Sequence, residues 1–297
     1  MNPFLERLGF RADDRVVIIH ADDLGMCHAT IPAVAELFDA GLVSSAATMV
    51  PCPWFPAVAA YASAAPSADI GVHTTLACEW DAYRWGPLST RDPASGLLDD
   101  EGYLHRTTPA VQSHANPSAV AVELNAQLDR ALASGIDVTH IDSHMGAAFA
   151  PHFLAAYLAA AARAHVPPLV PRLSEERMRE QGMPEEMITF AREAIPHLEA
   201  QGVAMVDHLV GMPLDRHEDR VETAKQLLGS LPPGLSYVII HPAIDTPELR
   251  AIAGGWRARV ADYQAFGSAE LRAWVRDQGI HVIGWRPIRD ALRGGYR

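Results

Sequence analysis

The sequence predicts an α/β fold, specifically a single-domain distorted (β/α) barrel of the TIM type with a long loop insertion after the third strand. Short apolar, β-branched segments alternate with longer segments of helical periodicity, which is typical of parallel strands joined by helices. The length of 297 residues suits one such barrel. No repeat, low-complexity tract or break in composition marks a second domain, so we expect one domain over residues 1–297.

Eight segments have the length and composition of buried strands. In chain order they are Arg15–His20, Val43–Val50, Asp69–Thr75, Val138–Ser143, Leu169–Ser174, Val203–Val210, Tyr237–His241 and His281–Arg286. Helices are expected between them, at residues 30–40, 54–64, 117–134, 151–165, 184–200, 217–230 and 268–278. An open, doubly wound sheet is the alternative arrangement for this order of elements.

The segment 76–116 interrupts the alternation and forms the predicted insertion. It follows the third strand, has about 40 residues and is rich in Trp, Tyr, Pro, Gly and Asp. Structureless loops of that length are uncommon unless they serve a function. Its side chains Trp80, Tyr83 and Trp85 have two interpretations: they pack inside the protein, or they form a platform on which a sugar ring stacks.

Composition and charge exclude several classes of function. The chain has 36 acidic and 24 basic residues, a formal net charge of −12, and no block of Lys or Arg, which argues against nucleic acid or an anionic membrane as partner. The cysteines Cys27, Cys52 and Cys78 share no C-x-x-C spacing, so we expect neither disulfides nor a cysteine zinc site. No secretory signal or membrane span is visible, and we expect a cytoplasmic protein.

Polar side chains stand at the ends of four predicted strands. They are His20, Asp22, Asp23, His73, His140, Asp142, His144 and His241. Because the carboxyl ends of barrel strands meet on one face, these residues should gather there, where active sites of such folds lie. Adjacent carboxylates such as Asp22 and Asp23 repel each other unless a cation or a shared proton intervenes. Asp and His are also the ligands of hydrolytic zinc and similar divalent sites, so the pattern indicates a metal.

Other interpretations of these residues exist. Asp22 and Asp23 could cap the helix that follows, and any one histidine is more often structural than a ligand. His140, Asp142 and His144 share one face of a strand, so we expect them to combine a ligand with the groups that orient it. Arg172, at the end of the fifth strand, is either a surface cation or a group that fixes a carboxylate, and the second is slightly favoured.

Several motifs resemble those of the YdjC-like carbohydrate deacetylases, which include the chitooligosaccharide deacetylases. They are His20-Ala-Asp-Asp-Leu-Gly25, Gly71-Val-His73, Thr139-His-Ile-Asp-Ser-His144 and His241-Pro242. Further blocks around Trp80–Leu88, Asp99–Tyr103 and Ala261–Phe266 extend the resemblance over nearly the whole chain. The resemblance implies a distorted barrel that removes an acetyl group from an N-acetylated sugar with one divalent metal ion, zinc or magnesium.

The resemblance also assigns roles to residues. It implies Asp23, His73 and His144 as metal ligands, Asp22 as the general base and His241 as the general acid. His20 stands where the family usually has Asn, so it could add a ligand.

We expect a small carbohydrate as the partner, and the chain could form a homodimer. The alternatives are another metal-dependent amidohydrolase or phosphoesterase on the same barrel, or an inactive sugar-binding protein. A phosphoesterase is expected to have more cationic side chains at the strand ends than this chain has.

Overall fold

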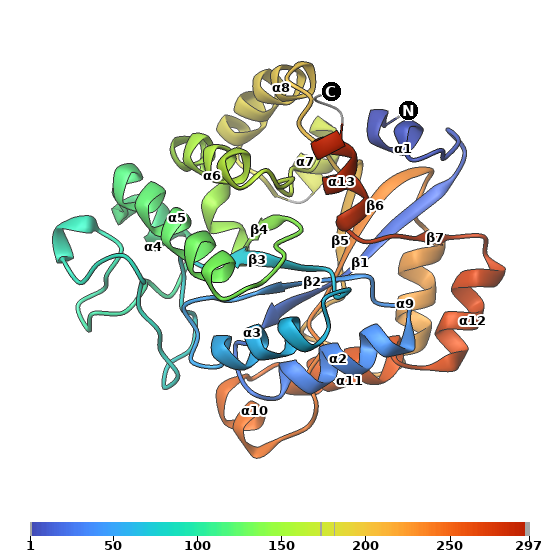
Figure 1. Ribbon diagram of the computed structural model, residues 1–297, viewed down its shortest axis with the longest axis horizontal. Helices are drawn as coiled ribbons and strands as arrows, with labels where there is room; N and C mark the ends of the chain where they lie inside the picture. The colour runs from blue at the N-terminus through green and yellow to red at the C-terminus, as the bar shows by residue number, and fades with distance from the viewer. Residues whose placement is uncertain (1, 173, 181, 295–297) are drawn as a thin grey trace.

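The computed structural model describes residues 2–172, 174–180 and 182–294. Within these ranges, seven parallel strands form a curled sheet that is surrounded by helices (Figure 1). The strand order is β4-β3-β2-β1-β6-β5, and the short β7 pairs with the first part of β1. The predicted α/β fold with a distorted barrel-like parallel sheet is therefore confirmed.

The element boundaries agree with most of the predicted segments. The strands are β1 Arg15–Leu24, β2 Ser45–Thr48, β3 Ile70–Thr74, β4 Ile141–Ser143, β5 His208–Gly211, β6 Gly234–Ile240 and β7 His281–Val282. The predicted helices are α2 Thr30–Ala40, α3 Phe55–Ala64, α5 Pro117–Ala133, α6 Pro151–Ala164, α8 Glu185–Ala200, α9 Arg220–Gly229 and α12 Ala269–Asp277. The helices not predicted are α1 Pro3–Arg7, α4 Thr108–His114, α7 Glu175–Glu180, α10 Pro247–Ile252, α11 Trp256–Phe266 and α13 Arg286–Gly294.

The predicted fifth strand, Leu169–Ser174, is not a regular strand. One isolated bridge joins Pro171 of this segment to Val206, and a second joins Pro168, just before it, to Ile141; position 173 lies outside the described residues. Proline has no N–H to donate to a ladder, so a segment with this many prolines pairs only intermittently. These bridges connect β4 to the residues that precede β5, so the two edges of the curled sheet approach each other through this segment.

The predicted insertion 76–116 contains regular structure, which corrects the expectation of a loop alone. It includes the 3₁₀ helix η1, Pro93–Ser95, and α4, whose first turn is capped by the Thr107 hydroxyl. The helix α4 lies against the 3₁₀ helix η2, His144–Phe149, which follows β4. The Thr108 hydroxyl donates to the carbonyl of Met145, so the insertion holds the loop after β4 in place.

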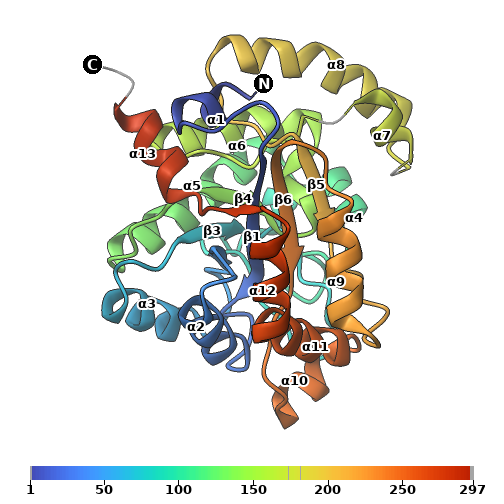
Figure 2. The same cartoon turned by 90° about the vertical axis from the view of Figure 1, so that its right-hand side faces the viewer.

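Alternate residues of β1 face the inside of the curled sheet. Near its amino end, Val16 and Ile18 pack with Tyr237 of β6 and with Trp285 in a buried apolar cluster that α1 and α13 cover (Figure 2). Two positions further along the strand, His20 is fully buried inside the sheet. The interior thus changes from apolar to polar toward the carboxyl ends of the strands.

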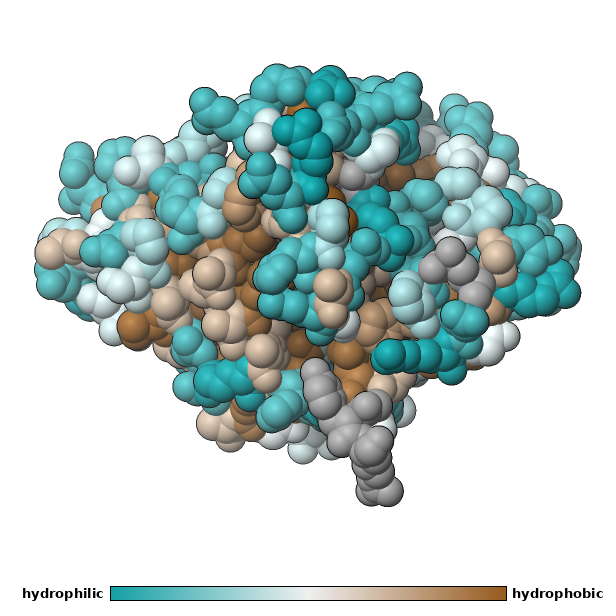
Figure 3. Space-filling model, turned by 90° about the horizontal axis from the view of Figure 1, so that it is seen from above, coloured by the Kyte–Doolittle hydropathy of each residue, from teal (hydrophilic) through white to brown (hydrophobic). Residues whose placement is uncertain are grey.

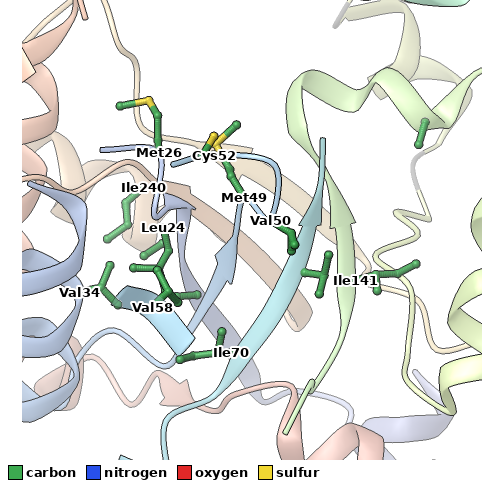
Figure 4. Close-up of a cluster of buried hydrophobic side chains, with 14 of the residues drawn as sticks. Leu24, Met26, Val34, Met49, Val50, Cys52, Val58, Ile70, Ile141 and Ile240 are labelled. Carbon is green, nitrogen blue, oxygen red and sulfur yellow. The ribbon is translucent and has the colours of Figure 1, made fainter. Parts of the chain in front are cut away.

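The outer face of the sheet carries the larger apolar core. Leu24 and Ile70 of the strands pack in one cluster with Val34 of α2 and Val58 of α3 (Figure 4). Because α/β strands of this kind are covered on their outer face by helices, near-continuous apolar runs are expected in them.

An apolar cavity opens on one face of the molecule, away from the predicted site residues. Figure 3 looks onto the face at which α1, α6, α8 and α13 lie, and shows apolar surface between polar helices. A largely apolar cavity of about 770 Å³ lies there, lined by residues of α6, α8 and α13 and by none of the predicted site residues. In the described part of the chain, no helix is long and apolar enough to cross a membrane.

Gly71 of β3 leaves room for the buried ring of His140, which yields a first prediction. A Cβ at position 71 would lie 2.4–2.6 Å from three atoms of that ring. The ring stacks on Trp285 with centroids 5.1 Å apart, so it cannot easily move aside. We expect Gly71→Ala to lower the free energy of unfolding by about 1–3 kcal/mol, measured by urea denaturation. The control is Gly211→Ala, where the nearest atom is 3.7 Å away. Equal stability of the two variants would contradict this packing argument.

Candidate metal centre and active site

The end of β1 brings two neighbouring carboxylates to the same side of the sheet. Neighbouring residues of a regular strand point to opposite faces. Here the pairing of β1 with β2 shifts by one residue between Ala21 and Leu24, and Asp23 has a φ of 61°. Such a bulge re-aims side chains. As a result, Asp22 Oδ2 and Asp23 Oδ1 lie 3.9 and 3.5 Å from Nε2 of His73.

Asp23, His73 and His144 turn one atom each toward a common point. Asp23 Oδ1 lies 3.5 Å from His73 Nε2 and 3.2 Å from His144 Nδ1, and the two ring nitrogens are 3.3 Å apart. All three side chains are buried. Ligands of a tetrahedral ion with bonds of about 2.0–2.1 Å lie about 3.3 Å from each other, so this spacing fits a zinc-like ion.

A carboxylate orients each of these histidines. Nδ1 of His73 lies 2.7 Å from Asp142 Oδ1, and Nε2 of His144 lies 2.9 Å from Glu79 Oε2. An ionised carboxylate only accepts hydrogen bonds, so these ring nitrogens carry the hydrogen and the opposite nitrogen of each ring faces Asp23. Carboxylates that hold metal-binding histidines in this way are common. Asp142 was predicted to orient His144 but contacts His73 instead, and Glu79, which contacts His144, was not predicted.

Arg259 of α11 fixes the other oxygen of Asp23. Its Nη1 lies 2.8 Å from Asp23 Oδ2, which leaves only Oδ1 directed at the two histidines. Arg259 is buried and also lies against the ring of Trp80, 5.8 Å from its centroid. Sequence reasoning missed Arg259 because α11 itself was not predicted.

The site has orphaned polar atoms, which test whether it suits a metal ion. Asp23 Oδ1 is buried and forms no hydrogen bond of ordinary geometry among the described residues. A buried carboxylate oxygen without a partner is costly. Burial lowers the pKa of His144, but Glu79 and Asp23 outweigh it and raise the pKa to about 9, so metal binding would displace a proton. The donor set therefore fits a divalent ion.

His20, Asp142 and Tyr237 form a polar layer beneath these atoms. The Tyr237 hydroxyl donates to Asp142 Oδ2 over 2.9 Å, and His20 Nε2 lies 3.1 Å from the same oxygen. His140 belongs to this layer but its Nε2 has no hydrogen-bond partner among the described residues, and its ring packs on Trp285. With no hydrogen bond from that nitrogen to hold His144, the structure does not support the predicted orienting role of His140.

Asp22 and His241 mark the open side of the site. Their side chains are 11% and 17% exposed, against at most 5% for the three converging residues. His241 Nε2 lies 3.8 Å from Asp22 Oδ2, and the backbone N–H of His241 donates to the carboxylate of Asp262 on α11. Burial lowers the pKa of His241 to about 4, so its ring is neutral near pH 7.

Two predicted residues lie elsewhere than expected, and the first is Arg172. It pairs with Glu199 and lies 3.8 Å from Asp207, so the carboxylates that it contacts are not those of the site. The prediction that Arg172 belongs to the site is therefore corrected.

The second residue that lies elsewhere than expected is Trp85. The aromatic residues of the insertion do not form one open platform. Trp85 is 3% exposed, and its indole N–H donates to the carbonyl of Ala77, so it is a core residue. Tyr83 packs against Trp85 and donates its hydroxyl to the carbonyl of Met26. Trp80 and Tyr83 are both half-buried, and of the two Trp80 lies next to Arg259, the arginine that contacts Asp23. The packing interpretation therefore holds for Trp85.

Comparison with known proteins assigns the family. The family model described as YdjC-like protein matches residues 16–277. The chain belongs to the YdjC-like family. A protein of Thermus thermophilus named carbohydrate deacetylase is 35% identical over 97% of this chain and 98% of its own length. Another of that name, from Thermoanaerobacter pseudethanolicus, is 24% identical over 93% of this chain and 100% of its own length.

A solved structure also resembles this one. It comes from Enterococcus faecalis V583, and its protein is named for cellobiose-phosphate cleavage. The TM-score is 0.76 at 23% sequence identity, with 93% of this chain and 99% of the other covered. At that identity the likeness concerns the fold, and it agrees with the curled parallel sheet of Figure 1.

The contact between Glu79 and His144 gives a second prediction. Without the Glu79 carboxylate, His144 Nε2 loses its acceptor and the ring is free to turn away from Asp23. We expect Glu79→Ala to weaken binding of zinc by about 10- to 100-fold in a competition titration with a chelator. The control is Glu101→Ala, an acid of the same insertion that pairs with Arg84 instead. Equal zinc affinity in both variants would exclude an orienting role for Glu79.

Proposed function

We propose that this protein is a metal-dependent hydrolase that removes an acetyl group from an N-acetylated sugar. The observation that carries this proposal is the convergence of Asp23, His73 and His144 on one point. The carboxylate of Asp22 lies beside that point, and Arg259 pairs with Asp23 and not with Asp22. The carbohydrate deacetylases to which the chain is similar supply the substrate class. The cytoplasmic location and the homodimer stay predictions from the sequence.

Asp23, His73 and His144 would hold one divalent ion, zinc or magnesium. Such an ion, when bound, polarises the amide carbonyl and acidifies water. Two nitrogen ligands favour zinc over magnesium, which prefers oxygen ligands. The remaining chemistry falls to side chains of this chain that lie on the open side of the site.

Asp22 is suited to accept the proton of the attacking water at Oδ2. That oxygen lies 3.8–3.9 Å from the nearest nitrogens of His241 and His73, so no strong hydrogen bond occupies it. A general base at this place contributes about 10²–10⁴-fold to the rate.

His241 borders the same opening and is neutral near pH 7, because burial lowers its pKa to about 4. A neutral ring can donate its N–H to the tetrahedral oxyanion, and it can pass a proton to the leaving amine only after it has itself been protonated. The low pKa therefore favours the oxyanion role over the role of resting general acid.

Phosphoester hydrolysis has less support. A phosphate substrate calls for free cationic side chains near the metal. Among the described residues, Arg259 is the arginine in contact with the converging side chains, and it is engaged by Asp23. An inactive sugar-binding protein would not need a base such as Asp22 beside three converging ligand atoms.

The activity itself can be tested by acetate release. Metal-stripped protein is incubated with a panel of N-acetylated mono- and oligosaccharides and resupplied with zinc, magnesium, manganese, cobalt or nickel. We expect acetate from at least one sugar, dependent on added metal and with about one ion per chain by elemental analysis. The absence of acetate with every sugar and every metal would contradict the proposal.

The role of Asp22 is tested by a substitution that removes its charge. Asp22→Asn keeps the shape of the side chain but cannot accept the water proton, so kcat should fall by about 100-fold or more with metal content unchanged. The matched control is Asp245→Asn, in the loop after His241, where the carboxylate pairs with exposed Arg250. Wild-type turnover in Asp22→Asn would make Asp22 a structural residue.

A further inference from the structure

His20 lies between two carboxylates and touches no solvent. Its Nε2 is 3.2 Å from Asp22 Oδ1 and 3.1 Å from Asp142 Oδ2. Neither contact has the angle of an ordinary hydrogen bond, so both are close polar contacts between the ring nitrogen and a carboxylate oxygen. His20 is 0% exposed, so it cannot contact a substrate.

The two oxygens of Asp22 have different surroundings because of this contact. Oδ1 is buried, faces His20 and has no other close partner among the described residues. Oδ2 is directed at the side where His73 and His241 lie, 3.9 and 3.8 Å away. His20 thus sets the orientation of the Asp22 carboxylate through its contact with Oδ1. This orientation decides that Oδ2 is the oxygen open to the reaction.

The ring of His20 is itself held on several sides. Its Nδ1 lies 3.1 Å from the hydroxyl of Ser45, its face stacks on Tyr237 with centroids 4.8 Å apart, and His140 meets it edge-on at 5.0 Å. A ring with neighbours on its face, its edge and both nitrogens cannot turn to follow Asp22. It therefore acts as a fixed point for the carboxylate.

We propose that His20 is a positioning residue for the reaction: it holds Asp22 Oδ1 and so presents Asp22 Oδ2 to the attacking water. This inference rests on the proposed function, in which Asp22 is the base. His20 also touches Asp142, the partner of His73, so one ring connects the base with a proposed metal ligand. The competing idea, that His20 is a further metal ligand, predicts a loss of metal when His20 is replaced.

The experiment compares three variants of the full chain. His20→Phe keeps a ring of similar size but has no N–H, whereas His20→Gln places an amide N–H at about the reach of Nε2. The matched control is His140→Phe, a histidine of the same buried layer whose Nε2 lies 4.0 Å from Asp142 and which, among the described residues, makes no charged contact with Asp22. Unfolding temperature, metal content, kcat and KM are measured for each.

We expect His20→Phe to lower kcat by about 10- to 100-fold, with KM and metal content within twofold of wild type, because a displaced base costs rate and not binding. His20→Gln should recover most of the lost kcat. His140→Phe should shift the unfolding temperature as much as His20→Phe but keep kcat within about twofold. An unchanged kcat in folded His20→Phe would overturn the proposal, and so would loss of the metal, which would make His20 a ligand.

A crystal structure of His20→Phe separates this inference from the proposed function. We expect the Asp22 carboxylate to rotate or to occupy several conformers there, and to keep its wild-type position in His20→Gln. An unmoved Asp22 in His20→Phe would overturn the positioning role even if the variant were inactive. Conversely, a wild-type protein that releases no acetate would refute the function, while the Asp22 position would still decide the role of His20.

Discussion

The buried carboxylate of Asp142 organises the interior of the sheet. Asp142 is 1% exposed. Its Oδ1 lies 2.7 Å from Nδ1 of His73, and its Oδ2 lies 2.9 Å from the Tyr237 hydroxyl and 3.1 Å from Nε2 of His20. A buried charge is tolerated only when polar partners surround it, so we expect these three side chains to be in place whenever the chain is folded. Because one partner turns a ring toward Asp23 and another lies against Asp22, the geometry of the site follows from the need to satisfy this one group.

The sequence was sufficient to predict that polar side chains gather at the carboxyl ends of the strands. Strands of parallel sheets end on a common face, and period-two alternation predicts His20 and Asp22 on the same side of β1. The same alternation predicts a common side for His140, Asp142 and His144, in and next to β4. The eightfold strand count was less accurate, because the prolines of residues 167–171 reduce the fifth segment to bridges. Local sequence gives the direction of a side chain well and the completeness of a ladder poorly.

What escaped prediction depends on contacts distant in the chain. Glu79 is a single acidic residue in a loop, and no motif around it indicates a contact with His144, which lies 65 residues later in the chain. Arg259 lies in α11, whose buried face also carries Asp262, the partner of Arg220 on α9. With two charged residues on that face, the helix lacks the apolar stripe by which helices are recognised. The aromatic run of the insertion is ambiguous for the same reason, since only the fold decides that Trp85 is enclosed and Trp80 is not.

The one-residue irregularity in β1 also has a consequence for protein design. Placing two acidic groups side by side in a parallel sheet normally requires two strands, because consecutive residues of one strand diverge. Here a single extra residue with a positive φ achieves it within one strand, while the pairing with β6 continues undisturbed up to Ala21. A designer who wishes to install a carboxylate pair could therefore insert one residue at a strand end and leave the surrounding scaffold as it is.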